Sequence, residues 1–355
     1  MKKLNFCKLA GAVLAAALMS STASAQTIRL TAASSHPPVL PWVGVLKDYV
    51  VPESNRRLEA RGSKSRIEWT EAYSGALFGP SEALKGVEDG IADVAWIGTM
   101  FEPGKLPLHN VHFYAPFVVS NAADAAAIGN DLHEKMPALN AELAKYNQVH
   151  LGSMGDATFH LITKTPIKSL ADLKGKKLLA GGAVARWLEG TGAIAVNSSF
   201  PEFYNNIATG VADGAVMTLT GMVPFKIHEV AKYVTLVDLG APITGALTIN
   251  ADTWKKLPPD VKVVFTELGK EYSAKVTAQV GANEDRFLKV MRDAGVSITT
   301  LDASERLKWA TALPNLSAEW VKLNESKGLP ARNVMNAFLK DAGARGAKPV
   351  RDWSK

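Results

Sequence analysis

Hydrophobic and polar positions in residues 168–220 follow the pattern of strands that alternate with helices. The periods predict strands at residues 176–180, 193–197 and 215–219, with helices at 183–189 and 201–210 between them. Gly181-Gly182 marks a turn too tight for a Cβ atom, Gly190 closes the first helix and Pro201 opens the second. Strands and helices of these lengths predict an α/β fold with a parallel sheet, whose ligands bind at the carboxyl ends of the strands.

The same order of elements occurs near the start of the chain. The pattern there predicts strands at 27–33, 66–73 and 92–97, a helix at 42–60 and a second helix that begins at Ser81. In both regions a Gly-x-Ala-Asp step precedes the third strand, at residues 90–93 and 210–213. That step alone is equally typical of an ordinary helix-to-strand junction. Together with the repeated order, it favours two similar lobes with a ligand cleft between them.

The rest of the pattern divides the chain among these lobes. Residues 26–148 and about 236–258 form lobe I, and residues 149–235 with part of the C-terminal helices form lobe II, with crossings at strand 149–154 and near 233–239. A helix at about 259–294 would be about 50 Å long, enough to bridge both lobes. Further helices at 303–327 and 330–342 fall in a C-terminal segment, 295–355.

The first 25 residues have the three parts of a secretory signal peptide. Lysines at positions 2, 3 and 8 precede or begin an apolar run at 9–19, and Ala23-Ser24-Ala25 is a cleavage site. We expect cleavage before Gln26 and a soluble periplasmic protein, with a retained anchor as the alternative. The only cysteine, Cys7, lies in this segment, so the mature chain has no disulfide, cysteine nucleophile or thiolate metal site.

Charge and motifs exclude several functions. Three of the six net positive charges lie in the signal, and the remaining charge of about +3 does not suggest binding to nucleic acid or to a membrane surface. The G-x-G-x-x-A pattern at Gly190 follows a helix and precedes a strand, the reverse of a phosphate-binding turn. His109 and His112 have no third ligand at metal-site spacing. We therefore expect no enzyme activity, no cofactor and no metal.

Aromatic residues at predicted strand ends are candidates for ligand contact. Trp96 and Tyr73 end strands on the side of the expected cleft, and Trp187 follows the Gly181-Gly182 turn. Packing is an equally good interpretation for these three, and the better one for Trp254, Trp309 and Trp320. The backbone N–H groups of Gly181 and Gly182 could bind an anion at a helix start, or could simply form a turn.

Several separated motifs resemble one family. SLADLKGKKL at 169–178, FPEFYNNIATGVADG at 200–214, GALFGPSEALKGVEDGIADVAW at 75–96 and the segment at 232–258 occur in the order found in periplasmic solute-binding proteins of TRAP transporters, of the dicarboxylate-receptor type. The resemblance covers nearly all of the mature chain. It implies a two-lobed, non-catalytic receptor that closes on a small organic acid and delivers it to sodium-coupled permease subunits. The family dimerises only in some members, and we expect a monomer here.

This chain departs from the family at the carboxylate-binding positions. The family's arginine at the end of the G-x-K-[IL]-R strand is Leu179 here, and further polar positions of the family fall near Phe159, Met217 and Leu239. We therefore expect an apolar pocket with walls from Trp96, Trp187, Phe159 and Met217.

Such a pocket would favour an aromatic or branched monocarboxylate, because a short dicarboxylate would leave a poorly paired buried charge. The anionic end could meet Gly181-Gly182, His36, His160 or Arg186. Two other classes stay open at this point: a ligand-sensing module that reports to a membrane sensor kinase, and an exported α/β enzyme such as a lyase.

Overall fold

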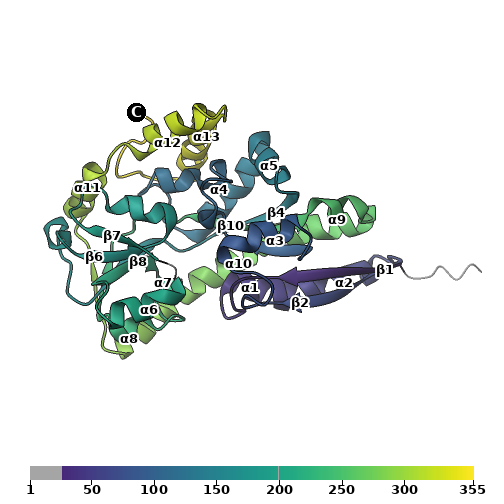
Figure 1. Ribbon diagram of the computed structural model, residues 1–355, viewed down its shortest axis with the longest axis horizontal. Coiled ribbons are helices and arrows are strands. Elements are labelled where there is room, and N and C mark those ends of the chain that lie inside the picture. Colours follow the sequence, from purple (N-terminus) through teal and green to yellow (C-terminus); the bar gives the residue numbers. More distant parts are fainter. Residues whose placement is uncertain (1–25, 199) are drawn as a thin grey trace, which may run out of the picture.

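A computed structural model describes residues 26–198 and 200–355 (Figure 1). The chain has the predicted two-lobed α/β fold. In Figure 1, β1, β2, α1 and α2 lie in one lobe, and β6, β7, β8 and α6 lie in the other. The signal peptide expected at residues 1–25 falls outside the described part of the chain. No helix among the described residues combines the length and hydropathy needed to cross a bilayer.

The first lobe contains a five-stranded sheet in the order β2-β1-β3-β10-β4. Its strands are β1 Gln26–Ala33, β2 Ser65–Ala72, β3 Val94–Ile97, β4 Gln148–Gly155 and β10 Ile243–Asn250. β1 is parallel to β2 and β3, as predicted, but β10 pairs antiparallel with β3 and β4. The sheet is therefore mixed, and β4 belongs to it although the sequence placed residues 149–154 in a crossing to lobe II.

The second lobe contains a six-stranded sheet in the order β11-β9-β5-β8-β6-β7. Its strands are β5 Phe159–Thr163, β6 Lys177–Ala180, β7 Ile194–Asn197, β8 Gly214–Thr218, β9 Tyr233–Leu236 and β11 Ser297–Thr300. β6 is parallel to β7 and β8, whereas β5 runs antiparallel to β8 and β9. The three predicted strands of residues 168–220 are thus confirmed, within a mixed sheet.

The repeated Gly-x-Ala-Asp step has the same role in both lobes. Asp93 accepts a hydrogen bond from the Thr31 N–H of β1, at 2.8 Å, and its own N–H donates to the Thr31 carbonyl at 3.0 Å. Asp213 makes the same two contacts with Lys177 of β6, both at 2.8 Å. Each aspartate therefore joins the strand that follows it, β3 or β8, to the parallel neighbour β1 or β6, which supports the two-lobe interpretation over an accidental motif.

Helices cover both sheets. In the first lobe these are α1 Pro41–Val45, a π-helical turn Leu46–Val50, α2 Val51–Ala60, α3 Ala83–Glu88, α4 Ala122–Lys135, α5 Pro137–Ala144 and α9 Ala251–Lys256. The 3₁₀ helices η3 Thr99–Phe101 and η4 Leu108–Tyr114 follow β3. The second lobe adds α6 Phe200–Ala208, α7 Leu219–Met222 and α8 Ile227–Val230. The predicted helix at 42–60 is confirmed, with the π turn at its centre.

The helix predicted at about 259–294 is α10, Pro259–Asp293. Its buried face includes Tyr272 and Val280, which pack in the core of the first lobe, and Met291, which packs in a core of the second. Pro258 precedes it and Gly295, with φ +77°, follows it, as expected for a helix start and stop. One helix therefore braces both lobes (Figure 1).

Two predicted helices need correction. The helix expected at 183–189 is a 3₁₀ helix, η6, at Gly182–Leu188. The helix expected at 303–327 is divided into α11 Ala303–Ala312 and α12 Leu316–Glu325, followed by α13 Ala331–Ala344. The division falls at Pro314, which has no N–H to donate, and the side chain of Asn315 caps the next helix by accepting from the Ala318 N–H at 3.0 Å.

Candidate functional site

Four aromatic side chains gather where β1 and β3 of the first lobe end. His36 follows β1, Trp96 lies in β3, and Trp42 and Phe101 lie in α1 and η3. The His36 ring centroid lies 5.2 Å from that of Trp96, 5.8 Å from that of Trp42 and 6.1 Å from that of Phe101. We call these four residues the aromatic group. Parallel strands bring their carboxyl ends to one sheet edge, so residues 60 positions apart meet here.

The polar atoms of the aromatic group are neutral. Burial lowers the pKa of His36 to about 4, so its imidazole carries no charge near neutral pH. Its Nδ1 lies 3.0 Å from the Ser35 hydroxyl. The indole Nε1 atoms of Trp42 and Trp96 are completely buried and have no hydrogen-bond partner among the described residues.

The second lobe contacts the first beside this group. Phe101 packs between the first-lobe core and a central core that includes Phe159 and Trp187. Phe225 packs between the first-lobe core and a third core on the α6 side of the second sheet. A Cβ atom on Gly182 would lie 3.0 Å from the Met100 carbonyl oxygen. We call Met100, Phe101, Gly182 and Phe225 the interlobe boundary.

Two carboxyl groups lie near the boundary without a cation. Asp156, just after β4, is fully buried, and its Oδ1 accepts from the Ala157 N–H at 2.7 Å and from the Thr220 hydroxyl at 2.9 Å. Glu284 lies on α10 between the first-lobe and second-lobe parts of its buried face. Neither forms an ion pair within residues 26–198 and 200–355.

The environment of these carboxyl groups favours their protonated forms. Burial raises the pKa of Asp156 to about 6. Burial, and then the charge of Asp156, raises the pKa of Glu284 to about 7. Both carboxyl groups are therefore negatively charged at alkaline pH and increasingly neutral below pH 7.

The cationic and imidazole groups considered as anion partners are engaged elsewhere. Arg186 pairs with Glu189 at 2.8 Å and with Glu319 at 2.6 Å. His160 Nδ1 accepts from the N–H groups of Val237, at 3.2 Å, and Asp238, at 3.1 Å, and burial lowers its pKa to about 4. Neither residue is free to neutralise a bound carboxylate in this arrangement.

The ten residues predicted for the site fall into separate groups. Phe159, Trp187 and Leu239 pack in the central core, where the Phe159 and Trp187 rings meet edge to face with centroids 5.5 Å apart. Leu179 and Met217 pack on the opposite face of the same sheet, in the α6-side core. All five are buried.

Of the remaining five, His36 and Trp96 belong to the aromatic group, and Gly181 precedes the boundary residue Gly182. The Gly182 N–H donates a long hydrogen bond to the Asn197 side-chain oxygen, at 3.4 Å. Tyr73 follows β2, is partly exposed, and donates to Glu71 at 2.8 Å. The structure therefore brings His36, Trp96 and the glycine turn together and leaves the other predicted residues in packed cores or apart.

Sequence reasoning missed four residues of this region: Trp42, Phe101, Asp156 and Glu284. Asp156 had a usable signal, because a polar residue directly after a buried strand commonly faces a site in α/β folds. Trp42 begins the predicted helix at 42–60, but the periodicity does not show which side chains face a site, and Phe101 lies in a short 3₁₀ helix that periodicity does not place. Glu284 is one of many acidic residues on a long helix, and only the packing of α10 on both lobes shows that it lies between them.

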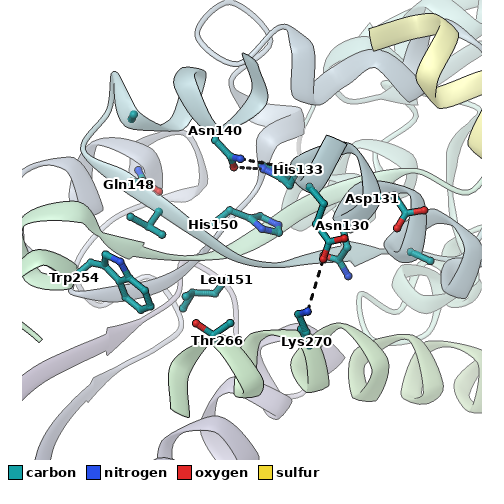
Figure 2. A pocket seen from close by; sticks show the side chains of 14 residues that line it. Asn130, Asp131, His133, Asn140, Gln148, His150, Leu151, Trp254, Thr266 and Lys270 are labelled. Atoms are coloured by element: carbon teal, nitrogen blue, oxygen red, sulfur yellow. Dashed lines mark hydrogen bonds and ion pairs between the residues drawn. The ribbon is translucent and has the colours of Figure 1, made fainter. Parts of the chain in front are cut away.

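A cavity of about 710 Å³ lies elsewhere, in the first lobe between α4, α5, β4, α9 and α10 (Figure 2). His133 and His150 line it with stacked rings, centroids 3.6 Å apart, and Lys270 lies 3.7 Å from Glu134 at its edge. None of the ten predicted residues is in its lining. Within the described residues, no three His, Cys, Asp or Glu side chains are placed to hold a metal ion.

Comparison with known proteins gives a consistent result. The family model described as bacterial extracellular solute-binding protein, family 7, matches residues 55–323. A solute-binding protein of Sulfitobacter sp. is 30% identical over 148 residues, 41% of this chain and 44% of that protein. A C4-dicarboxylate-binding periplasmic protein of Rhodobacter capsulatus is 27% identical over 42% of this chain and 45% of its own length. These two matches thus span less than half of each relative.

Other matches extend over nearly the whole chain. A solute-binding protein of Albidiferax ferrireducens is 24% identical over 87% of this chain and 91% of its own length. The crystal structure of a TRAP solute-binding protein from Rhodoferax ferrireducens, with copurified benzoate, has a TM-score of 0.77 at 20% identity over 90% of this chain and 98% of that one. A marine metagenome TRAP protein specific for aromatic acids, with 3-hydroxybenzoate, has a TM-score of 0.76 at 24% identity over 90% and 99%.

Proposed function

The chain belongs to family 7 of the bacterial extracellular solute-binding proteins, and from this premise we propose that it captures a hydrophobic organic acid, aromatic above all, between its lobes. Members of this family are periplasmic, non-enzymatic receptors for organic acids in TRAP transport. We further propose that this chain is exported by the signal at residues 1–25, acts as a monomer and delivers its ligand to TRAP permease subunits.

The observation that carries the choice of ligand is the aromatic group at the interlobe boundary. Three aromatic rings lie within about 6 Å of the His36 ring, at the sheet edge where α/β folds bind ligands. An apolar or aromatic ring gains from burial against them and from edge-to-face contact. Proteins with the same fold were crystallised with benzoate, 3-hydroxybenzoate and mandelate, and others with galacturonate or glucuronate, so the fold accommodates aromatic acids but does not by itself select them.

The charges at the boundary argue against a short dicarboxylate. Leu179 and Phe159 replace the cationic or polar groups of the family, and both are buried in cores. A second carboxylate on the ligand would meet Asp156 and Glu284 rather than a cation. Burying an unpaired charge beside like charges is unfavourable, so one anionic end and one apolar end fit this region better.

Capture would occur by closure of the lobes on α10. The helix packs on both lobes and can act as a fixed brace while the strand connections near Asp156 and Leu239 flex. A ligand that contacts Trp96 on one lobe and Phe225 on the other has more contacts in the closed state. It would therefore shift the equilibrium toward closure, the state that a permease can distinguish from the empty receptor.

A thermal-shift screen of the purified exported protein tests the proposal. The panel contains benzoate, 3-hydroxybenzoate, mandelate, branched short-chain monocarboxylates, C4 dicarboxylates, uronates and cationic controls. We expect aromatic or branched monocarboxylates to raise the melting temperature by mass action. We expect Trp96→Ala to weaken that shift. Stabilisation by C4 dicarboxylates or uronates alone would refute the proposed ligand class while leaving the family intact.

A further inference from the structure

Two indole N–H groups in the aromatic group have no hydrogen-bond partner. Trp42 is 6% exposed and Trp96 is 2% exposed, and both Nε1 atoms are sealed from solvent and unpaired among the described residues. The two ring centroids lie 5.5 Å apart at an angle of 35°. The two indole rings with orphan donors therefore lie side by side, next to the boundary residue Phe101 through His36.

Of the six buried indoles in residues 26–198 and 200–355, three are paired and three are not. Those of Trp187, Trp309 and Trp353 donate to the carbonyl oxygens of Phe113, Trp187 and Pro116 at 2.6–2.7 Å. Trp320 is a third buried orphan, but it stacks with Tyr114 in the central core, away from the aromatic group. Among the described residues, Trp42 and Trp96 are the two orphan indoles whose rings pack against one another.

An unpaired buried N–H group is costly, by about 1–3 kcal/mol each, so a native structure usually supplies a partner. Nearby protein groups do not supply it. The His36 Nδ1 atom is within hydrogen-bond distance of the Ser35 hydroxyl, and the Tyr272 hydroxyl donates to the carbonyl oxygen of Trp42 at 2.9 Å rather than accepting from its indole. An acceptor from outside the chain would satisfy both indoles.

We propose that the indole N–H groups of Trp42 and Trp96 together bind the carboxylate of the ligand, in place of the arginine that Leu179 replaces. This inference rests on the proposed function and specifies how the same site recognises an acid. A carboxylate has enough lone pairs to accept from both indoles, and hydrogen bonds to a charged acceptor are about twice as strong as neutral ones. Phe101 and Phe225 then contact the apolar part of the ligand.

This arrangement selects a ligand with a single carboxylate. Neutral donors stabilise one anionic group through dipoles without adding a positive charge, so they do not compensate a second carboxylate. The unpaired Asp156 and Glu284 oppose that second charge. The chemical class is therefore an aromatic or branched monocarboxylate whose remaining surface is apolar.

Indole ¹⁵N–¹H spectra of the wild-type protein give the direct test. Benzoate, 3-hydroxybenzoate and mandelate are the probes, with benzamide as a neutral analogue of benzoate. Trp42→Phe and Trp96→Phe assign the two resonances and keep an aromatic ring in place. At saturation with a bound acid, both resonances should move downfield and the Trp320 resonance should not move. Benzamide should bind more weakly than benzoate.

Affinities of the variants complete the test. Each of Trp42→Phe and Trp96→Phe should weaken acid binding about tenfold or more, while Trp320→Phe, which removes an orphan donor elsewhere, should leave it unchanged. If an acid binds the wild type but both resonances stay in place, or both variants bind within twofold of wild type, the inference is wrong and the proposed function survives. If none of the acids binds, the proposed function fails and this inference fails with it.

Discussion

Gly152 of β4 and Gly269 of α10 cross with no room for a side chain on either. A Cβ atom on Gly152 would lie 2.2 Å from the Gly269 carbonyl oxygen, and one on Gly269 would lie 2.2 Å from the Leu151 carbonyl oxygen. Backbone atoms cannot yield as a flexible side chain can. This crossing fixes the bridging helix onto the first lobe, and it is the reason that glycine is needed at the two positions.

Gly269→Ala should therefore destabilise the protein. Separating β4 from α10 disturbs packing on both sides of the crossing, and we expect a loss of about 2 kcal/mol or more in the free energy of unfolding. Gly281→Ala, on the same helix, is the matched control, because no atom lies within 4 Å of its added Cβ. The free energy of unfolding of that variant should rise by about 0.5–1 kcal/mol, because alanine favours a helix more than glycine does. Urea unfolding of both measures the difference, and equal effects would contradict the close-crossing argument.

Leu179→Arg restores the family residue but should not restore its function here. Leu179 is fully buried, with Met217 and Phe203 in the same core, so the guanidinium would enter an apolar core without a carboxylate partner. We expect the free energy of unfolding to fall by about 3–5 kcal/mol and the variant not to bind C4 dicarboxylates. Urea denaturation measures the first, and calorimetric titration with succinate measures the second. Lys177→Arg, at an exposed position of the same strand, is the control and should be neutral.

Trp187→Phe separates a packing role from ligand contact. The change removes the 2.6 Å hydrogen bond to the Phe113 carbonyl oxygen and leaves that oxygen without its indole donor. We expect a loss of about 1–3 kcal/mol in stability, with ligand affinity unchanged within twofold. Trp96→Phe should show the reverse, weaker binding with a smaller stability change. If the Trp187→Phe protein is as stable as the wild type but binds the ligand more weakly, Trp187 contacts the ligand.

The sequence was most informative where local pattern and tertiary structure agree. Strands β1, β2, β6 and β7, the helix α10 and the two Gly-x-Ala-Asp steps follow from periodicity and from glycine and proline chemistry. Strands β10 and β5 were not predicted, because a strand buried on both faces has no alternation of apolar and polar residues by which to recognise it. Helices α4 and α5 were not predicted either.

The candidate site was less predictable for a related reason. Trp96 could be selected because it ends a strand. Trp187 was selected because it follows a glycine turn, and Phe159 and Met217 from their positions in the family; these three are packed in cores. Whether an aromatic residue faces a ligand or a core depends on which face of a sheet it occupies and on what covers that face. Single-sequence periodicity contains neither piece of information for a strand buried on both faces.

Affinity for an acid should rise as the pH falls from 8 to 6. The pKa values of Asp156 and Glu284 are raised to about 6 and about 7, so both groups lose negative charge in this range while a ligand carboxylate, with a pKa of about 4, stays ionised. Glu284→Gln should raise affinity at pH 8 by about threefold or more and flatten the profile.

Isothermal titration at pH 8, 7 and 6 measures this profile, and buffers with different ionisation enthalpies report proton uptake on binding. Asp285→Asn, an exposed change on the same helix, is the control and should have a smaller effect. An affinity that falls between pH 8 and pH 6 would show that the ligand does not approach the two carboxyl groups as an anion.

Stability should fall in acid because of the stacked imidazoles of His133 and His150. Burial lowers the pKa of His133 to about 3 and that of His150 well below 6.5, so the folded protein binds their protons less readily than the unfolded chain does. Their contribution to stability is complete above pH 6.5 and is lost as the pH falls below it, at up to about 1.4 kcal/mol per pH unit for each histidine. Glu142 has the opposite effect. Burial raises its pKa to about 7, so its protonation stabilises the folded protein as the pH falls below 7.

His150→Gln isolates one of these contributions. The free energy of unfolding is measured in urea at pH 7.5, 6.5, 5.5 and 4.5. Below pH 6.5 it should fall less steeply with pH in the variant than in the wild type, by up to about 1.4 kcal/mol per pH unit, the contribution of one histidine, whatever the variant loses at pH 7.5. Asn140→Ala removes the 2.8 Å contact to His133 Nδ1 but keeps both imidazoles, so it should lower stability at every pH with the slope unchanged. An unchanged slope in His150→Gln would mean that His150 is protonated in the folded protein, which its burial against a second imidazole opposes.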